Sequence, residues 1–522
     1  MESFLKQHGE KIVGVLTGFD RIVFRGTLRN LSYVAGMESF LGFHDAAFSR
    51  FGQFVERASD DVKQHAREFA RTHRRPYVHI KSPSVSKEQW ATDICDRDGI
   101  EEGLVCVFGC IEMCQAYEYI PNTRRTGPWL RKKTRQCLHV YFYFMDREFG
   151  LTYVRLQTWF PMSIQIGVNG REYLARRMDR AGMDYEKCDN CFTRVDDVPR
   201  AQKMLDALHR RDWSKFLNRL ARQVNPHLAR GGLLDGYGHG YYWTYRETET
   251  ATDVMFRDAA ALAALYPSLV RHATEQFGCA DVLRFLGRRT NSRFADDPNT
   301  DRKRWIEGVR VKHRVEENSM KMYDKQGSVL RIETTIVNPK RFRVYRQATR
   351  GGEPTLAWVP LRKGIMDTAR RAEIGRAANE RYLEALGVVG AAAPTRHLLD
   401  PVSRRTKRAG RPFRGLRPID ADDARVFETV LSGEHLLQGF RNRDIREALY
   451  SELPDASSRK RASARVTRLL SLLRAHKLIR KVSHTLWYRV TTAGHRIMST
   501  ALQLRNLDLA LVGNGSSHQT DQ

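Results

Sequence analysis

The feature that most constrains the fold lies near the C-terminus, where three helical segments precede a short β-hairpin. Helices are predicted from "DDARVFETVLSG", "FRNRDIREALYSEL" and "SSRKRASARVTRLLSLLRAHKLI", with Ser457 or Ser458 as the N-cap of the third. "IRKVSHTLWYRVT" then alternates as two strands, and "TAGHRIMSTALQLRN" predicts a closing helix. The third helix carries an apolar stripe that includes Val466, Leu470 and Leu473, so residues 421–508 are predicted to form a domain.

This order of elements, and the segment "RVTRLLSLLRAHKLIRKVSHTLWYRVTTAG" in particular, resembles the recognition helix and wing of winged helix-turn-helix proteins. The resemblance implies that the module binds DNA, with the third helix in a groove and the wing on phosphates. The residues expected to face DNA are Arg459, Lys460, Arg461, Ser463, Arg465, Arg468, Lys481, His484 and Arg489. A winged helix used only for protein contacts is the alternative, which the basic surface disfavours.

The charge of the whole chain also points to a polyanionic partner. Its 88 Lys and Arg outnumber its 60 Asp and Glu, which gives a net charge of +28 and a pI of about 10.0. An excess of this size repels itself in water unless an anionic partner neutralises it. DNA is the leading partner and structured RNA is the alternative. An anionic membrane surface is less favoured, because no basic amphipathic helix with an aromatic face is found.

The remaining bulk properties favour a cytoplasmic protein with no membrane segment. No apolar run reaches the roughly 20 residues that span a bilayer. The start, "MESFLKQHGEK", has no long apolar segment of the kind found in signal peptides. The 8 cysteines are therefore expected to be reduced thiols.

The chain is predicted to be an α+β protein with antiparallel hairpins and a C-terminal winged helix. A mixed α/β region that binds nucleic acid is expected at 1–250, with the clearest hairpin at Cys137–Phe160. A central α+β region is expected at 251–389, opening with a helix from residue 251. Residues 390–420 read as a basic linker and residues 509–522 as a disordered tail.

The central segment "NSMKMYDKQGSVLRIETTI", residues 318–336, alternates as a β-hairpin. A two-residue turn at Gln326-Gly327 would mix polar and apolar residues on both faces. A three-residue turn ending at Gly327 places Met322 opposite Leu330 and separates the faces, so this register is predicted. Ser319, Lys321, Tyr323, Arg331 and Glu333 then share the polar face.

That polar face resembles the tyrosine-bearing strand pair of rolling-circle replication initiators, on the residues "KMYDK" and "LRIET". The resemblance implies a DNA-nicking enzyme of a mobile element or replicon. Tyr323 would be the nucleophile, Glu333 a ligand of Mg²⁺ or Mn²⁺, and Lys321 and Arg331 would clamp phosphate oxygens. A structural hairpin with a solvated charged face is the alternative.

The metal ligands would have to be carboxylates or distant histidines. The family's His-hydrophobic-His motif is missing, because "LHVYFYF" has Tyr141 where the second histidine would stand. Glu249 and Asp253 lie four apart, so a helix would bring both toward Glu333. Favourable acidic residues in a first helical turn are the simpler interpretation of that pair.

Several other groups have both a functional and a structural interpretation. Asp20 sits in an apolar strand-like run, as catalytic aspartates of RNase H-like nucleases do, although a buried Asp–Arg pair is favoured. The spacing of Cys106, Cys110 and Cys114 predicts one packed helix face, and the lone pair Cys188 and Cys191 makes a zinc site the less favoured interpretation. His139, Tyr141, Tyr143, Arg155 and Gln157 either stack unpaired bases or pack in the core.

These observations favour an enzyme that nicks DNA or transfers a strand by metal-dependent cleavage. A non-catalytic DNA-binding regulator and a protein that binds structured RNA remain the alternatives. The pattern GxxxxGK[ST] is absent, which disfavours an ATP-driven motor.

Overall fold

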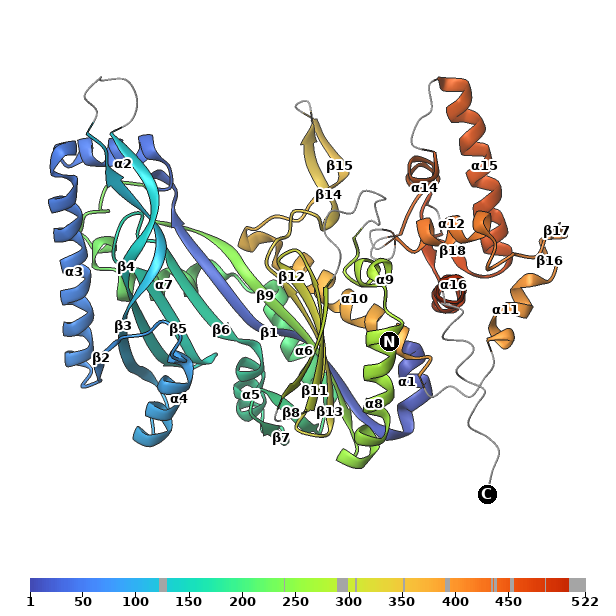
Figure 1. Cartoon of the computed structure of the whole chain (residues 1–522), viewed down its shortest axis with the longest axis horizontal. Helices are drawn as coiled ribbons and strands as arrows, with labels where there is room; N and C mark the ends of the chain where they lie inside the picture. The colour runs from blue at the N-terminus through green and yellow to red at the C-terminus, as the bar shows by residue number, and fades with distance from the viewer. Residues whose placement is uncertain are drawn as a thin grey trace.

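The computed structural model describes residues 1–121, 129–238, 240–288, 299–305, 308–350, 353–389, 395–432, 435, 439–450, 455–483 and 485–506. It contains long helices, one large sheet and several small hairpins (Figure 1), which confirms the α+β class. Among these residues, no helix is both long and apolar enough to cross a bilayer.

One sheet of 11 strands forms the frame of the molecule. All neighbouring strands are antiparallel except β2 and β3. From one edge to the other, the order is β10 (Asn299–Trp305), β11 (Gly308–Val315), β12 (Asn318–Lys325), β13 (Val329–Ile336), β9 (Tyr241–Phe256), β1 (Ile12–Leu28), β6 (Ile164–Asn169), β5 (Gly150–Gln157), β4 (Leu130–Asp146), β3 (Gly103–Tyr119) and β2 (Tyr77–Ile80).

The long strands β1 and β9 join the N-terminal and central regions into this one sheet, and they run side by side between them (Figure 1). The predicted boundary at residue 250 therefore falls inside a strand. The helix predicted from residue 251 begins only at Ala259, as α8 (Ala259–Glu275). Residues 251–256 instead complete β9, because its alternate residues Val254 and Phe256 enter the core beneath α8.

The two faces of the sheet are chemically different. On β1, Ile22 and Phe24 enter the larger core, whereas Arg21 and Arg25 project from the other side. The apolar face is covered by α3 (Phe51–Thr72), α7 (Trp213–Val224), α8 and α10 (Thr368–Leu386). We call the side that carries Arg21 and Arg25 the polar face.

Smaller elements cover the rest of the frame. On the polar face, α4 (Lys87–Asp98) packs over β3 and β4, and the hairpin of β7 (Tyr185–Cys188) and β8 (Cys191–Val195) lies beside β9. The edge of β1 is covered by α6 (Val198–Asp206), where Gln202 bonds both backbone groups of Thr17. The other helices of this part are α1 (Glu2–His8), α2 (Val34–Phe43), α5 (Gly170–Arg180) and α9 (Cys279–Phe285).

The cysteines at 106, 110 and 114 lie on strand β3, so the predicted helix is wrong. A spacing of four residues returns to one side of a strand as well as to one side of a helix. Spacing alone therefore could not separate the two structures.

The C-terminal region has the predicted order of elements. These are α12 (Ala421–Val430), α14 (Asn442–Leu449), α15 (Ala456–Ala475), β18 (Ile479–Lys481), β19 (Tyr488–Val490) and α16 (Thr492–Arg505). Val466, Leu470 and Leu473 are buried in its core, as predicted. The N-cap of α15 is Asp455, which accepts a hydrogen bond from the Ser458 backbone, so the predicted serine cap is wrong.

Most of the predicted linker is folded. It contains α11 (Arg396–Ser403), β16 (Thr406–Arg408) and β17 (Arg411–Phe413), and Leu399, Val402 and Leu416 enter the C-terminal core. Few apolar residues anchor this segment, which is why its sequence shows little periodicity. Residues 390–394 and the predicted tail lie outside the described residues.

A hairpin of β14 (Arg343–Arg350) and β15 (Glu353–Pro360) connects the frame to this C-terminal domain. The Tyr345 ring lies 5.1 Å from that of Trp487, and the Arg441 guanidinium lies 4.3 Å from the Trp487 ring. The hairpin and the domain therefore share an aromatic contact.

Candidate metal and phosphodiester-cleavage site

The β12–β13 hairpin has the predicted faces but a different register. Its loop is Gln326-Gly327-Ser328, and both Gln326 (φ 57°) and Gly327 (φ 74°) adopt positive φ. Tyr323 pairs with Arg331 and Met322 with Ile332, two residues away from the prediction. A slip of two residues keeps every side chain on its own face, so the predicted separation of faces is confirmed while the predicted pairs are wrong.

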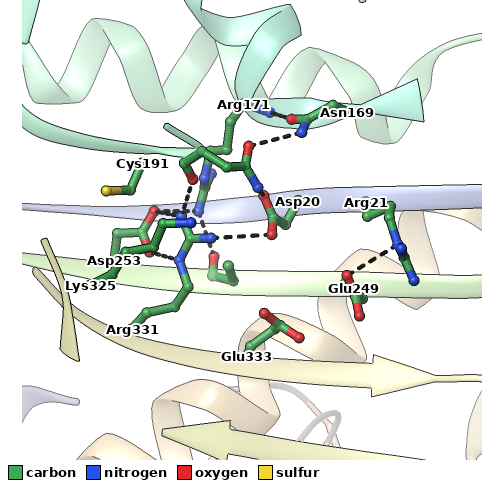
Figure 2. Close-up of polar contacts among 12 residues, drawn as sticks. Asp20, Arg21, Asn169, Arg171, Cys191, Glu249, Asp253, Lys325, Arg331 and Glu333 are labelled. Carbon is green, nitrogen blue, oxygen red and sulfur yellow. Dashed lines mark hydrogen bonds and ion pairs between the residues drawn. The ribbon is translucent and has the colours of Figure 1, made fainter. Parts of the chain in front are cut away.

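Three carboxylates from three adjacent strands meet on the polar face. Asp20 (β1), Glu249 (β9) and Glu333 (β13) each offer an oxygen, and these oxygens lie within 4.8 Å of one another. Figure 2 shows the three groups converging on one space from neighbouring strands. We call this group the acidic triad.

An irregularity in β1 delivers Asp20 to the triad. The register between β1 and β9 shifts between Phe19 and Ile22, so two residues, Asp20 and Arg21, oppose Glu249 alone. Such a bulge redirects side chains. Both polar residues reach the same side, and the Arg21 guanidinium lies 3.4 Å from Glu249.

A buried arginine fixes the position of Asp20. The Arg331 side chain is 1% exposed, and its Nε and Nη2 donate to Asp253 at 2.5 and 2.9 Å. Its Nη1 donates to Asp20 at 3.2 Å (Figure 2). Asn190 donates to the other oxygen of Asp20 at 2.7 Å. The favoured interpretation of Asp20 as a buried partner of arginine is confirmed, although the arginine comes from β13.

Glu333 is held by two side chains of the neighbouring strand. Lys321 donates to one oxygen of Glu333, and the Tyr323 hydroxyl donates to the other at 2.9 Å. Burial alone would raise the pKa of Glu333, but the charge and hydrogen bond of Lys321 outweigh it and lower that pKa. Burial and the charge of Glu333 raise the pKa of Tyr323 well above its usual value.

Glu249 is the member of the triad whose charge is least compensated. Burial and the nearby charge of Glu333 raise its pKa to about 7, against the opposing effects of Lys321 and Arg21. The Lys321 ammonium on β12 lies 3.4 Å from Glu249, as far as the Arg21 guanidinium does. A carboxylate with such a pKa is a candidate proton acceptor at neutral pH, or a ligand that lacks its cation.

The triad lines an open pocket of about 640 Å³. Four further carboxylates line the pocket, from α4, α5 and the β7–β8 turn: Glu88, Asp96, Glu172 and Asp189. In a chain of net charge +28, this local excess of oxygen ligands is the chemistry that Mg²⁺ and Mn²⁺ prefer. The residues present therefore fit a divalent metal.

Of the three metal ligands expected from sequence, Glu333 and Glu249 belong to the triad and Asp253 does not. Asp253 lies in a strand rather than a helix, and Arg331 and Arg171 both contact it. Burial opposes ionisation of Asp253, but these two arginines lower its pKa. Asp20 takes its place, and its position in an apolar strand was the sequence signal for that role.

The predicted catalytic residues Lys321, Tyr323, Arg331 and Glu333 lie together, but in different environments. Tyr323, Arg331 and Glu333 line the pocket. Arg331 uses its hydrogen bonds on Asp20, Asp253 and the Asn190 carbonyl, so it orders the site rather than clamping a phosphate. Lys321 neutralises part of the triad.

The aromatic residues expected to stack on bases are buried instead. His139, Tyr141 and Tyr143 pack under α4 or between strands, and Gln157 is buried beside them. Tyr141 and Arg155 both donate to Glu112, at 2.6 Å from the hydroxyl and from Nη2. Core packing is therefore the correct interpretation.

The other candidate groups have simple placements. Cys188 is exposed and Cys191 buried at the β7–β8 turn, and within the described residues only the triad gathers three or more metal-ligating side chains. On the C-terminal domain, the exposed basic residues are Arg459, Lys460, Arg461, Arg465, Arg468, Lys481 and Arg489. Ser463 is half-buried and donates to Asn442, and His484 lies outside the described residues.

Comparison with known proteins gives no relative. No family model, curated protein or solved structure matches the chain.

Proposed function

We propose that this protein is a DNA-cleaving enzyme that uses Mg²⁺ or Mn²⁺ to break a phosphodiester bond, in nicking or strand transfer for a mobile element or replicon. The acidic triad carries the proposal. Three buried or half-buried carboxylates meet in an open pocket of a strongly basic chain. Repulsion among them is expensive, and a divalent cation relieves it.

The residues that would hold the metal are Asp20, Glu249 and Glu333. A bound divalent ion would supply positive charge for the phosphate oxygens in the transition state and would acidify an attacking water. Arg331 and Asn190 orient Asp20, and Tyr323 orients Glu333. Glu249, with a pKa of about 7 in the metal-free protein, would release its proton when the metal binds near neutral pH.

Two nucleophiles, water and Tyr323, are compatible with this pocket, and the state of the Tyr323 hydroxyl favours water. The raised pKa of Tyr323 keeps its hydroxyl protonated, and that hydroxyl already donates to Glu333. If Tyr323 attacks, its proton passes to a carboxylate, its oxygen bonds phosphorus, and the bond to the 3′-oxygen breaks. The 3′-oxygen then takes a proton, and a 5′-phosphotyrosine remains. We assign Tyr323 a positioning role and keep nucleophilic attack as the alternative.

The C-terminal domain would bring duplex DNA to the enzyme. One side of the long helix α15 carries a buried apolar stripe, and the other side exposes Arg459, Arg465 and Arg468. These arginines suit a DNA groove lined with phosphates. The alternative function is that of a non-catalytic regulator. In that case the C-terminal domain would still bind DNA, and the triad would catalyse no reaction.

The test is an assay of supercoiled plasmid and 5′-labelled single strands with Mn²⁺. Wild type should nick, whereas Asp20→Asn and Glu333→Gln, purified in parallel, should not. Tyr323→Phe should retain cleavage and no product should be covalently bound to protein. An adduct that vanishes in Tyr323→Phe would establish the tyrosine route, and equal activity in wild type and both carboxylate variants would refute the proposal.

A further inference from the structure

A row of cations continues from the acidic triad along the same two strands. On β1, Arg25 projects from the polar face, four residues beyond Arg21 and two beyond Val23. On β9, Arg246 lies in a second register shift, between the pairs Val23–Glu247 and Phe24–Tyr245. Both arginines are exposed. Beside them, the Lys363 carbonyl accepts a hydrogen bond from the Tyr245 backbone, which places the exposed Lys363 along β9.

The row ends at an exposed aromatic ring. Tyr242 pairs with Thr27 in the sheet, and the residue is 43% exposed. The Arg29 guanidinium lies 3.9 Å from the ring centre. Arg29 and Tyr242 line a pocket of about 350 Å³ together with Gly238 and Gly240, two glycines with positive φ.

The charges of this row are not balanced within the described residues. Neither Arg25 nor Arg246 forms an ion pair there, whereas Arg155, two strands away, is bound by Glu112. Partial burial of its exposed side chain and the nearby charges of Arg246 and Arg155 lower the pKa of Arg25. Cations that repel one another in the free protein gain from binding a polyanion.

The dimensions of the row suit one nucleic-acid backbone. Strands rise about 3.3 Å per residue, so Arg25 lies roughly 16 Å and Thr27 roughly 23 Å along β1 from Asp20. Arg25 and Arg246 come from neighbouring strands, which are about 4.8 Å apart, so the row is one backbone wide. A guanidinium beside an exposed ring forms a platform on which an unpaired base can stack.

We propose that Arg25, Arg246, Arg29 and Tyr242 bind a single nucleic-acid strand, with its phosphates on the arginines and a base on Tyr242, and lead it into the acidic triad. The inference rests on the proposed function for its direction, since the triad defines where the strand is cut. Single-stranded binding follows from the platform, because a duplex keeps its base faces stacked.

The experiment measures binding of the full chain to fluorescein-labelled dT20 by anisotropy, in EDTA, over a range of KCl concentrations. Arg25→Gln/Arg246→Gln should weaken binding about tenfold and lower the salt slope by about 1.4, which is roughly 0.7 per lost phosphate contact. Arg25→Lys/Arg246→Lys should retain most of the affinity and the slope. Tyr242→Ala should weaken binding about tenfold with the slope unchanged.

The matched control is Arg222→Gln/Arg271→Gln, which removes two exposed arginines from α7 and α8 on the other side of the sheet. Wild-type affinity of Arg25→Gln/Arg246→Gln, or an equal loss in the control, would overturn the proposal. Preferential loss of binding to a 20-base-pair duplex would assign the row to duplex DNA instead and would also overturn it.

Cleavage separates this proposal from the proposed function. If the row variants bind dT20 weakly but wild type shows no Mn²⁺-dependent cleavage, the row stands and the assigned chemistry fails. If the row variants bind normally while Asp20→Asn abolishes cleavage, the chemistry stands and the row fails.

Discussion

Glu112 and Glu249 lie on the same face of the same sheet and have similarly small side-chain exposure, 15% and 13%. Their pKa values nevertheless differ widely. That of Glu112 is about 2, and that of Glu249 is about 7. Glu249 is more deeply surrounded by protein than Glu112, so both its burial and its charged neighbours separate the two pKa values.

Glu112 is a single carboxylate surrounded by donors. Burial opposes its charge, but Tyr141 and Arg155 more than compensate, and the Lys87 ammonium also lies 3.3 Å from it. Glu249 instead shares Lys321 with Glu333, and Asp20 adds a third carboxylate nearby. The charge of Glu112 is fully compensated by its neighbours, so we interpret this cluster as structural. The charge of the acidic triad is not fully compensated, so the triad can bind a further cation. A single buried acidic residue therefore does not indicate a metal site. A cluster in which carboxylates outnumber the cations available to them does.

The largest expected contrast is in cleavage. Glu333→Gln should reduce the Mn²⁺-dependent nicking rate at least about 10³-fold, because it removes one metal ligand and the Lys321 partner. Glu112→Gln should change the rate less than about twofold, since that network lies outside the triad. The comparison fails if both variants lose activity together in initial-rate assays.

The second contrast is in stability. Arg331→Met leaves two buried carboxylates, Asp20 and Asp253, without their shared partner, and should lower the free energy of unfolding by about 3–5 kcal/mol. Arg155→Met leaves Glu112 with Lys87 and Tyr141 and should cost about 1–2 kcal/mol. Urea denaturation followed by circular dichroism measures both, and equal losses would contradict the distinction between the clusters.

The third contrast is in pH dependence. Metal binding needs ionised Glu249, so protonation below its pKa of about 7 should weaken Mn²⁺ binding about tenfold per pH unit, with a plateau above about pH 8. Glu112→Gln should leave this curve unchanged, because Glu112 is ionised throughout the range. Isothermal titration at several pH values provides the curve, and a flat wild-type profile between pH 5.5 and 7 would be incompatible with Glu249 as a ligand.

The smallest contrast is between two lysines. Lys321→Met removes a competing cation from the triad and should tighten Mn²⁺ binding about fivefold, equivalent to roughly 1 kcal/mol. Lys87→Met, beside Glu112, should leave Mn²⁺ affinity unchanged. Weaker binding in Lys321→Met would mean that Lys321 orders the carboxylates rather than competing with a metal.

Much of the fold follows from local patterns, and the site mostly does not. Strict alternation placed Lys321, Tyr323, Arg331 and Glu333 on one face even though the loop moved by one residue, since a shift of two in pairing preserves the faces. The order of elements in the C-terminal domain followed from helical stripes and a hairpin in the same way.

The acidic triad could not be assembled from sequence because its members come from distant strands. Asp20 meets Glu333 only because β1, β9 and β13 are neighbours, and sheet order is set by packing of the whole chain. No sequence pattern predicts the bulge that turns Asp20 and Arg21 to one side. A spacing of four residues led to a wrong helix prediction twice, at Asp253 and at the three cysteines. Strands and helices both return a side chain to one face at that interval.

The most direct test of the central claim is anomalous diffraction at the manganese edge from crystals of the full chain grown with MnCl₂. We expect a manganese peak bound by Asp20, Glu249 and Glu333, which is lost in Asp20→Asn crystals that retain the fold. A wild-type map with no peak at these carboxylates, or with manganese only at other groups, would contradict it.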